Sequence, residues 1–464
     1  MGAGDRFGRR TLGRRAVLGR TAAAAAAGGG VAAAACGGAT GGSAPGGTGE
    51  TSPRLGPQGY TFRQPVALTY WKSLEGPRHE AQVKLTDDFN ARRTDVKVSL
   101  EHVGAYAQAA EKLTAALAAN TPPDVMLLTV DQHMPAFARQ GALHPLDAFG
   151  RADKSAQVER YAPGFIKNGT INGKLYQIPF ARSTPLLYFN RDHLRAAGQA
   201  ETPPGTWEQL VDLGQKLVRA GVTQVPSDDP KRAALPAVPY WWSFQSMVWA
   251  FGGKYSDDKF TPTMTQRETV EAMEYLADLV RRHQVARAYR TAGAAQTAFI
   301  QGQLSFQIES TAQLTQIEKA APFRVGAAFM PAQKQRAVPG GGSGLCIINS
   351  IPVEKKEAGW EFMKFVTTAP NTVYFSQATG YMVVRTDAAA LPEFQKHLQE
   401  NPNAKVTFDQ MQYVRTQDSI AEVPQATRTI EEHMQQVLFE QKLVRTVFEE
   451  LQRQLTVLAQ DVRR

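Results

Sequence analysis

The segment Val66-Ala67-Leu68-Thr69-Tyr70-Trp71 is a short run of apolar, β-branched and aromatic residues, a composition typical of a buried strand. Gly76-Pro77 follows as a turn, and apolar residues then recur at helical spacing from Ala81 to Phe89. Residues 96–100 alternate between apolar and polar side chains, which indicates a half-buried strand. A strand, a helix and a second strand in this order predict an α/β fold with largely parallel sheets.

The same alternation continues toward the C-terminus. The apolar run 125–128 predicts a further strand, and Thr206 with Gln209 matches the capping box that starts a helix. Residues 429–458 have apolar side chains at helical spacing, which predicts a long amphipathic region. A chain of 464 residues is long enough for two or more domains.

The N-terminus has the features of an export signal. Arg14-Arg15 resembles a twin-arginine motif, and an Ala- and Gly-rich run then leads to Cys36. Ala33-Ala34-Ala35-Cys36 resembles a lipobox, in which the Cys is acylated after cleavage, although Ala33 stands where Leu is usual. The alternative is a disordered leader with an incidental Cys. We expect an export signal over residues 1–35 and lipidation of Cys36.

Residues 36–59 consist largely of Gly, Ser, Thr and Pro, a composition that predicts a flexible tether. The only other cysteine, Cys346, lies in an apolar run, so we expect it to be buried and predict no disulfide. The formal net charge is +9, but the six arginines and one aspartate of residues 1–35 account for +5 and leave +4 for the rest. No basic run interleaved with aromatic residues occurs there, so nucleic acid is not an expected partner.

Motifs for catalysis are missing. The eight histidines include no H-E-x-x-H pair, and no Cys/His group has zinc spacing. The Gly-rich run 340–344 matches neither a nucleophile elbow nor a P-loop, and it predicts either a tight connection or a close approach of backbone to a ligand. We therefore expect no enzyme, no metal and no cofactor. The alternative of another class is a secreted glycoside hydrolase, but no feature singles out the paired carboxylates that it needs.

Ordered motifs across the chain resemble those of a known family. They are residues 70–76, 122–125, 173–179, 187–191 and 299–303. Together they are similar to the extracellular solute-binding proteins of carbohydrate ABC importers, the group that includes maltose-binding protein. Within that family, residues 71–76, 183–188, 379–381 and 423–425 most resemble the glycerol-3-phosphate-binding branch.

The resemblance implies a two-lobed periplasmic-binding-protein fold, with each lobe discontinuous in sequence and the ligand in the cleft between them. On this basis, lobe one comprises residues 60–182 and 308–353. Lobe two comprises residues 183–307 and 354–464. Ligands in open α/β sheets bind at strand ends, where this cleft is expected.

The resemblance also implies ligand-binding residues. Tyr106 and Tyr381 match tyrosines whose phenols can hydrogen-bond a hydroxyl or phosphate oxygen, and Ser183 matches a ligand serine at the lobe crossing. The alternative for Tyr106 is a half-buried structural tyrosine. The alternative for Ser183 is a turn cap beside Pro185.

Trp241 and Trp242, in the aromatic run that begins at Tyr240, resemble tryptophans that pack on the carbon skeleton of the ligand. A run of three aromatics has no amphipathic period, so we expect at least one to be exposed. We expect one of the two tryptophans to line the cleft.

Further polar contacts follow from the same resemblance. Ser310 and Thr311 fall where the family places a ligand hydroxyl, and Asp131 falls near its acidic ligand position. Gly341 or Gly342 can offer a backbone N–H to an anion.

The positively charged residue that would contact a phosphate is the hardest to assign. Arg428 lies one residue beyond the arginine position of the branch, and it suits phosphate as a bidentate donor. Its alternative is a surface arginine, and Arg182 is a substitute candidate. Glu309 departs from the small residue of the branch, and an acid is unfavourable near phosphate unless it is paired.

The resemblance therefore implies a binding protein that delivers glycerol-3-phosphate, or a glycerophosphodiester such as glycerophosphocholine, to the permease subunits of an ABC importer. The alternative ligand is a neutral mono- or oligosaccharide, which Glu309 and the aromatic run favour. We expect a monomer outside the cytoplasm, in the periplasm or at the cell surface, with the lipidated Cys36 as its only attachment to the membrane.

Overall fold

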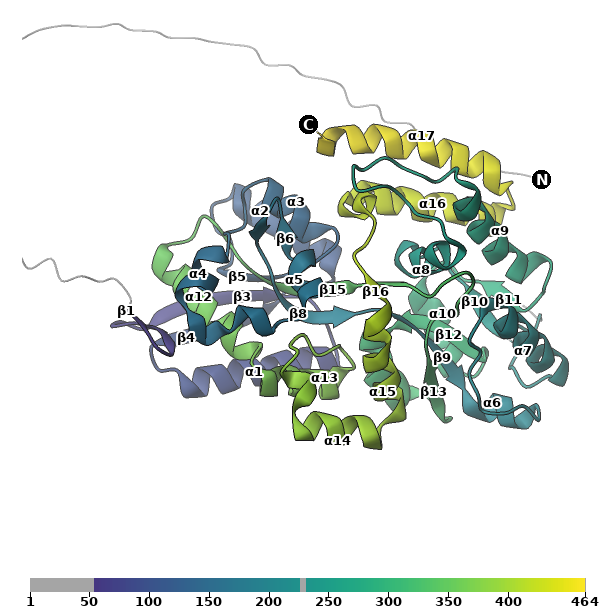
Figure 1. Ribbon diagram of the computed structural model, residues 1–464, viewed down its shortest axis with the longest axis horizontal. Coiled ribbons are helices and arrows are strands. Elements are labelled where there is room, and N and C mark those ends of the chain that lie inside the picture. Colours follow the sequence, from purple (N-terminus) through teal and green to yellow (C-terminus); the bar gives the residue numbers. More distant parts are fainter. Residues whose placement is uncertain (1–53, 226–230, 464) are drawn as a thin grey trace, which may run out of the picture. The chain divides into compact units, whose positions relative to one another are not determined.

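A five-stranded sheet lies in the first of two large hydrophobic cores in the computed structural model, which describes residues 54–225 and 231–463 (Figure 1). Two smaller apolar clusters accompany them. The strands lie in the order β4-β3-β5-β15-β8. Their bounds are β3 (Val66–Lys72), β4 (Val96–His102), β5 (Val125–Thr129), β8 (Ile178–Ser183) and β15 (Gly341–Ile347). β3 is parallel to β4 and β5, as the run 66–100 predicts, whereas β15 is antiparallel to both of its neighbours.

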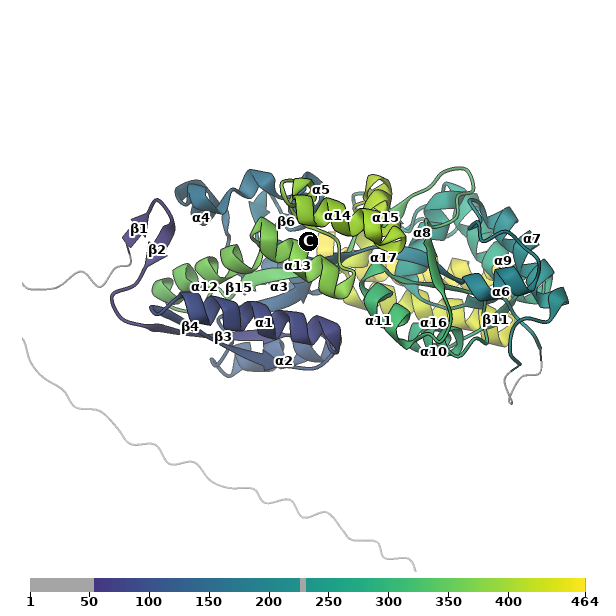
Figure 2. The same ribbon diagram turned by 90° about the horizontal axis from the view of Figure 1, so that it is seen from below.

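Four helices cover this sheet: α1 (Pro77–Arg92), α2 (Tyr106–Ala118), α12 (Val353–Val366) and α13 (Ala369–Thr379). α1 buries Ala81, Leu85 and Phe89 on one face, as their spacing predicts. Figure 2 shows α1, α12 and α13 packed together beside the sheet. α12 and α13 follow residue 354, where lobe two was expected to resume, yet they pack in the first core. The reason is that apolar residues of α12 face β3, with the ring of Phe362 5.2 Å from that of Tyr70.

The second core surrounds an antiparallel sheet. β9 (Pro185–Asn190) lies between β12 (Phe306–Ser310) and β13 (Val325–Ala328), and it is antiparallel to both. The expectation of largely parallel sheets is therefore wrong for this part of the chain. An apolar run such as 185–190 shows that a strand is buried but does not give the direction of its neighbours. A small parallel pair, β10 (Leu235–Ala237) with β11 (Ala286–Ala288), completes this core.

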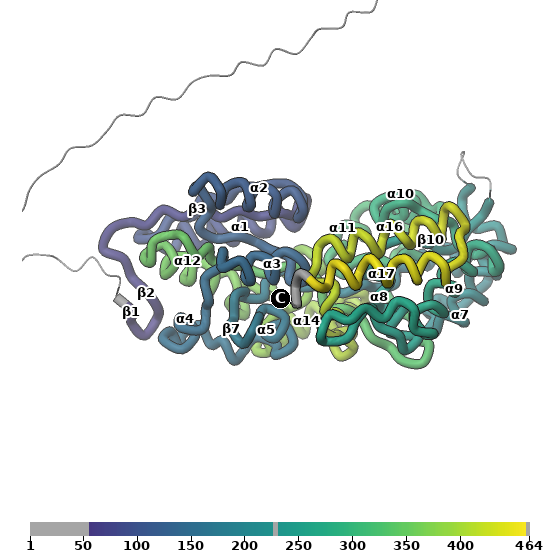
Figure 3. The backbone as a smooth tube through the Cα atoms, turned by 90° about the horizontal axis from the view of Figure 1, so that it is seen from above, coloured from purple at the N-terminus to yellow at the C-terminus, as the bar shows by residue number. Residues whose placement is uncertain are grey.

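The helices around the second core are α7 (Trp207–Ala220), α8 (Trp241–Phe251), α9 (Arg267–Arg281), α16 (Pro424–Glu440) and α17 (Val444–Arg463). Thr206 caps α7 as predicted, because its Oγ1 accepts the Gln209 N–H at 3.2 Å. The Gln209 side chain accepts from the Gly205 N–H at 2.8 Å. The predicted tail region is two helices, since Gln441 adopts φ 56° and ends the first, and they lie side by side (Figure 3).

The remaining helices with at least one α-helical turn are α3 (His133–Arg139), α4 (Asp147–Ala152), α5 (Pro163–Asn168), α6 (Arg191–Ala196), α10 (Ala292–Ile300), α11 (Leu314–Ala320), α14 (Pro392–Glu400) and α15 (Pro402–Asp409). Short strands β6 (Thr170–Ile171) and β7 (Lys174–Leu175) form a hairpin. None of the helices within 54–225 and 231–463 is long and apolar enough to cross a membrane.

A small hairpin of β1 (Arg54–Gly56) and β2 (Gly59–Thr61) occupies the end of the segment predicted as a tether. Tyr60 holds it against the first core, because its backbone N–H donates to Glu361 Oε1 at 2.8 Å and its ring lies 6.0 Å from Phe149. The predicted export signal and Cys36 lie outside the described residues.

The chain passes between the two cores at adjacent segments. β8 continues into β9 through Thr184, and β12 ends beside it. The Thr311 N–H donates to Thr184 O at 2.9 Å, and Gln410 Nε2 donates to Thr184 Oγ1 at 2.8 Å. A third passage is formed by β14 (Val338–Pro339), which pairs in parallel with β16 (Val414–Arg415). These segments form the floor on which the candidate site is built.

Candidate functional site

A cleft of about 350 Å³ lies where elements of the two cores meet. The first core contributes the end of β5, the start of α3, the loop before α1 and the first turn of α2. The second core contributes the end of β12, the loop after it and the start of α8. The cleft is therefore formed by strand ends and helix N-termini, where backbone donors and polar side chains are exposed to a ligand.

Most of the residues predicted from the resemblance lie together in this cleft. They are Tyr106, Asp131, Ser183, Trp241, Trp242, Ser310, Gly342 and Tyr381. They come from positions up to 275 residues apart in the sequence, from 106 to 381, so only the fold brings them together.

Three predicted residues do not line the cleft. Thr311 is fully buried, and its Oγ1 accepts the Thr184 N–H at 3.3 Å, so it joins the crossing segments. Gly341 is covered by Trp242, since a Cβ atom there would lie 2.6 Å from the indole ring. Arg428 lies on the exposed face of α16. The spacing of apolar residues in the sequence predicts which face of α16 is buried. It does not predict whether the opposite face, which has Arg428, borders the cleft or the solvent.

Tyr106 and Tyr381 form a polar wall of the cleft, and the buried Ser343 lies behind Tyr106. The Tyr106 hydroxyl is 3.0 Å from Ser343 Oγ. Burial, followed by the influence of Tyr381, raises the pKa of Tyr106 well above its ordinary value, and burial also raises the pKa of Tyr381. Both phenols therefore keep their protons at neutral pH and can donate hydrogen bonds to an anionic or hydroxyl oxygen.

The opposite wall is aromatic. Tyr240 and Trp242 have ring centroids 6.0 Å apart, and α8 begins at Trp241. Trp241 and Trp242 are buried and line the cleft, and Tyr240 is half-buried, so the expectation of an exposed ring in this run of three is wrong. The reason is that Gly341 has no side chain and lets the Trp242 ring rest on its backbone. The buried Trp242 Nε1–H has no hydrogen-bond partner in the part of the chain that the structure describes.

Sequence reasoning missed the one guanidinium in the cleft, that of Arg78. It lies in the first turn of α1, where Nε donates to Glu75 O at 3.4 Å and Nη2 donates to Gln316 Oε1 at 3.3 Å. These are long bonds, so most of its donor capacity remains for a ligand. The available signal was its place directly after Gly76-Pro77, because a residue in the first turn of a helix at a strand end faces the cleft of such a fold.

Glu309, which the sequence marks as unfavourable for a phosphate and favourable for a sugar, also lines the cleft. Its Oε1 accepts the Ser310 N–H at 2.7 Å. Burial raises the pKa of Glu309, and the charge of Arg78 opposes that rise. Asp131 is the second carboxylate, with Oδ1 accepting from the Gln132 N–H at 2.9 Å and Oδ2 from Gln417 Nε2 at 3.2 Å.

Arg182, the substitute candidate for an anion, does not line the cleft. It is fully buried, its guanidinium lies 4.9 Å from the centre of the Phe165 ring, and burial lowers its pKa to about 10. Its Nε and Nη1 have no hydrogen-bond partner among the described residues. It belongs to β8, directly before Ser183, and the charge of Asp131 opposes the lowering of its pKa.

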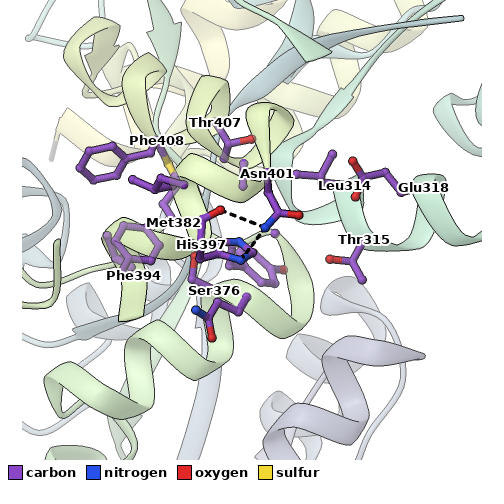
Figure 4. A pocket seen from close by; sticks show the side chains of 16 residues that line it. Leu314, Thr315, Glu318, Ser376, Met382, Phe394, His397, Asn401, Thr407 and Phe408 are labelled. Carbon is purple, nitrogen blue, oxygen red and sulfur yellow. Dashed lines mark hydrogen bonds between the residues drawn. The ribbon is translucent and has the colours of Figure 1, made fainter. Parts of the chain in front are cut away.

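A smaller cavity of about 150 Å³ lies behind Tyr381, between α11, α13, α14 and α15 (Figure 4). Its lining mixes apolar and polar side chains, and Asn401 Nδ2 donates to the His397 carbonyl at 2.9 Å within it. It contains no arginine or lysine, so it lacks a cation for a phosphate. No group of three or more His, Cys, Asp or Glu residues within 54–225 and 231–463 is placed to hold a metal ion.

Comparison with known proteins adds an independent observation. The family model described as bacterial extracellular solute-binding protein matches residues 84–406. The sn-glycerol-3-phosphate-binding periplasmic protein UgpB of Pectobacterium atrosepticum is 27% identical over 364 residues, which are 74% of this chain and 79% of that protein.

Solved structures give the same fold. UgpB from Mycobacterium tuberculosis, in complex with glycerophosphocholine, is 31% identical with a TM-score of 0.78, over 85% of this chain and 98% of that one. Maltose-bound T. maritima MalE3 is 22% identical with a TM-score of 0.74, over 85% of this chain and all of that one (100%). The latter likeness concerns the fold alone.

Proposed function

Because the chain belongs to the family of bacterial extracellular solute-binding proteins, with the two-lobed fold that the sequence predicted, we propose that it binds a glycerophosphodiester or glycerol-3-phosphate in the cleft and delivers it to the permease subunits of an ABC importer. The observation that supports this ligand class most directly is the composition of the cleft. One guanidinium, a set of neutral hydroxyl donors and an aromatic wall face a common space. These are the groups that a phosphate, a glycerol and a carbon skeleton require.

Each group has a role in this proposal. Arg78 meets the phosphate, and the neutral phenols of Tyr106 and Tyr381 donate to its oxygens or to glycerol. Ser183 and Ser310 add hydroxyls at the crossing segments, and Asp131 accepts from a ligand hydroxyl. Trp241 and Trp242 pack on the C–H surfaces of the ligand. Gly342 lets the ligand approach the backbone, since it adopts φ +90° and has no side chain.

We assign the phosphate to Arg78 and not to Arg428. Arg78 lines the cleft and has only two long bonds to the protein. Arg428 lies on the exposed face of α16, outside the cleft. A bidentate contact requires the guanidinium plane to face the anion at hydrogen-bonding distance, and an arginine on a solvent-exposed helix face does not offer this.

Two side-chain bonds join the two cores beside the cleft. Gln132 Nε2 donates to Thr427 Oγ1 at 2.9 Å, and Arg139 forms an ion pair with Glu422 in the short turn Ser419–Glu422. Both bonds join α3, or the residue before it, in the first core to elements of the second core. We propose that they hold the two cores together around a bound ligand and that the segments around Thr184 act as the hinge.

Isothermal titration calorimetry of the purified protein with glycerophosphocholine, glycerol-3-phosphate and maltose tests the ligand class. We expect saturable binding of at least one of the two phosphates, with no product formed on prolonged incubation. Ligand at a hundredfold excess over its Kd should also stabilise the fold by about 2.7 kcal/mol in thermal unfolding. Binding of maltose with silence toward both phosphates would refute the phosphate ligand.

A neutral sugar is the second candidate, because the cleft contains two carboxylates and one guanidinium, and carboxylates accept well from sugar hydroxyls. Salt separates the two candidates. Affinity for a phosphate falls as salt rises, whereas affinity for a neutral sugar is nearly constant.

We also propose that Cys36 is acylated and attaches the protein to the outer face of the cell membrane. Cys36→Ser should move the protein from the membrane fraction to the soluble extracytoplasmic fraction. Cys346→Ser is the matched control, since Cys346 is buried in β15 and should leave the attachment unchanged. Retention of Cys36→Ser in carbonate-washed membranes would exclude the lipid anchor.

A further inference from the structure

The cavity between α11, α13, α14 and α15 differs from the cleft in size and in chemistry (Figure 4). Its volume is about 150 Å³, and an apolar cavity of that size in a protein can hold a benzene ring. Tyr381 borders both spaces and lies between them. A compact molecule can therefore occupy the cavity while the cleft is used by another ligand.

One side of the cavity is apolar. Phe394 of α14 and Phe408 of α15 have ring centroids 5.5 Å apart in an edge-to-face arrangement, and Figure 4 shows Met382 on the same side. Leu398 and Ala404 add aliphatic surface to the lining. Aromatic edges and a thioether sulfur make favourable contacts with a further ring. This side of the cavity therefore fits a ligand with a single apolar ring.

The other side has a negative charge. Figure 4 shows Glu318 and Thr315, both from α11, across the cavity from the two phenylalanines. Glu318 is exposed, and its Oε1 accepts from a neutral donor, Asn403 Nδ2, at 2.7 Å. None of the described residues that line the cavity is an arginine or a lysine. The carboxylate therefore attracts a cationic group to the rim of the cavity and repels an anionic one.

His397 adds no positive charge to this lining. Asn401 Nδ2 donates to the His397 carbonyl at 2.9 Å and to His397 Nδ1 at 3.1 Å, so Nδ1 is an acceptor and the ring proton lies on Nε2. Burial lowers the pKa of His397, so the imidazole is neutral at pH 7. Among the described residues that line the cavity, Glu318 is then the one with a charge at neutral pH.

We propose that this cavity is a second ligand site, for a small amine that has a single apolar ring. The ring packs against Phe394, Phe408 and Met382, and the ammonium group lies at the rim beside Glu318. The site does not depend on the function proposed for the cleft, since its ligand has the opposite charge and needs no guanidinium. It also excludes a glycerol phosphate, because the lining offers a phosphate a carboxylate and no cation.

Three compounds with the same ring and different charges test this inference. At pH 7, 2-phenylethylamine is cationic, 2-phenylethanol is neutral and phenylacetate is anionic. In ligand-observed NMR titrations of the purified protein, the amine is expected to bind about threefold more tightly than the alcohol, the ratio that one exposed ion pair gives. Phenylacetate is expected to bind more weakly than either. Equal affinity for all three compounds, or no binding of the amine and the alcohol, would overturn the site.

Variants of the lining locate the bound amine. Glu318→Gln removes the charge at an exposed position, and it should weaken the amine about threefold and leave the alcohol unchanged. Glu393→Gln is the matched control, since it removes a carboxylate from α14 outside the lining and should change neither affinity. An amine that keeps its advantage over the alcohol in Glu318→Gln would overturn the role of the carboxylate.

Ala404→Leu tests the position of the ring. The larger side chain fills part of the cavity, so both the amine and the alcohol should lose saturable binding, while thermal unfolding reports whether the variant is folded. Unchanged binding of the amine in folded Ala404→Leu would place the ring elsewhere on the protein and overturn the proposal.

Discussion

Arg78→Gln provides the most direct test of how the cleft recognises an anion. The guanidinium of Arg78 forms two long hydrogen bonds to the described residues, of 3.4 Å to Glu75 O and 3.3 Å to Gln316 Oε1. Bonds of this length on a partly exposed side chain contribute at most about 0.5 kcal/mol, so thermal unfolding without ligand should be almost unchanged.

The loss in binding should be much larger. A hydrogen bond to a charged group contributes about 1.5–3 kcal/mol, which corresponds to a weakening of roughly tenfold to more than a hundredfold in Kd. Removing Arg78 also removes the positive charge that acts on Glu309, which adds to the loss for a phosphate. Affinity for maltose, if it is measurable, should change little.

Calorimetry of wild type, Arg78→Gln and Arg428→Gln with glycerophosphocholine at two salt concentrations measures this difference. Arg428→Gln is the matched comparison, because it removes the same group from the exposed face of α16, and it should stay within about twofold of wild type. The salt dependence of wild type should be reduced in Arg78→Gln. An unchanged affinity in Arg78→Gln, or a tenfold loss in Arg428→Gln, would refute the assignment of the phosphate to α1.

Three further predictions concern packing, closure and pH. Gly341→Ala should weaken ligand binding about tenfold, because the added Cβ would lie 2.6 Å from the Trp242 ring and must displace that ring. Gly293→Ala is the control for affinity and thermal stability, since nothing lies within 4 Å of its added Cβ. Arg139→Ala should raise Kd up to about fivefold by removing the ion pair to Glu422 between the two cores. Lys405→Ala, which removes an ion pair within α15, should leave Kd unchanged in the same titration. Burial raises the pKa of Glu431 from 4.5 to about 7, so the wild type loses stability as the pH rises through that interval. In denaturant titrations, Glu431→Gln should be more stable than wild type by on the order of 1 kcal/mol at pH 8 and equal to it near pH 4. The same difference at both pH values would contradict a contribution from the ionisation of Glu431.

The sequence alone determined the class of fold and most of the local structure. The run 66–100 specifies strand, helix and strand, because apolar periodicity records which face of each element is buried. Thr206 is the cap of α7, because a side-chain oxygen there satisfies a backbone N–H that no helix bond can reach. Family motifs also pointed to the tyrosines, tryptophans and serines that line the cleft, since these occur in short segments that are recognisable one at a time.

Only the tertiary structure determined which charged side chains line the site. Arg78 and Glu309 are 231 positions apart and meet only because α1 and the end of β12 open on the same cleft, whereas Arg428 turns to solvent on α16. The direction of the strands beside β9 and the packing of α12 on the first sheet were decided in the same way. A periodic pattern shows that a residue is buried or exposed within its own element. Such a pattern does not predict the long-range contacts that place two elements opposite each other. Those contacts determine which charged side chains line the cleft and can contact a ligand.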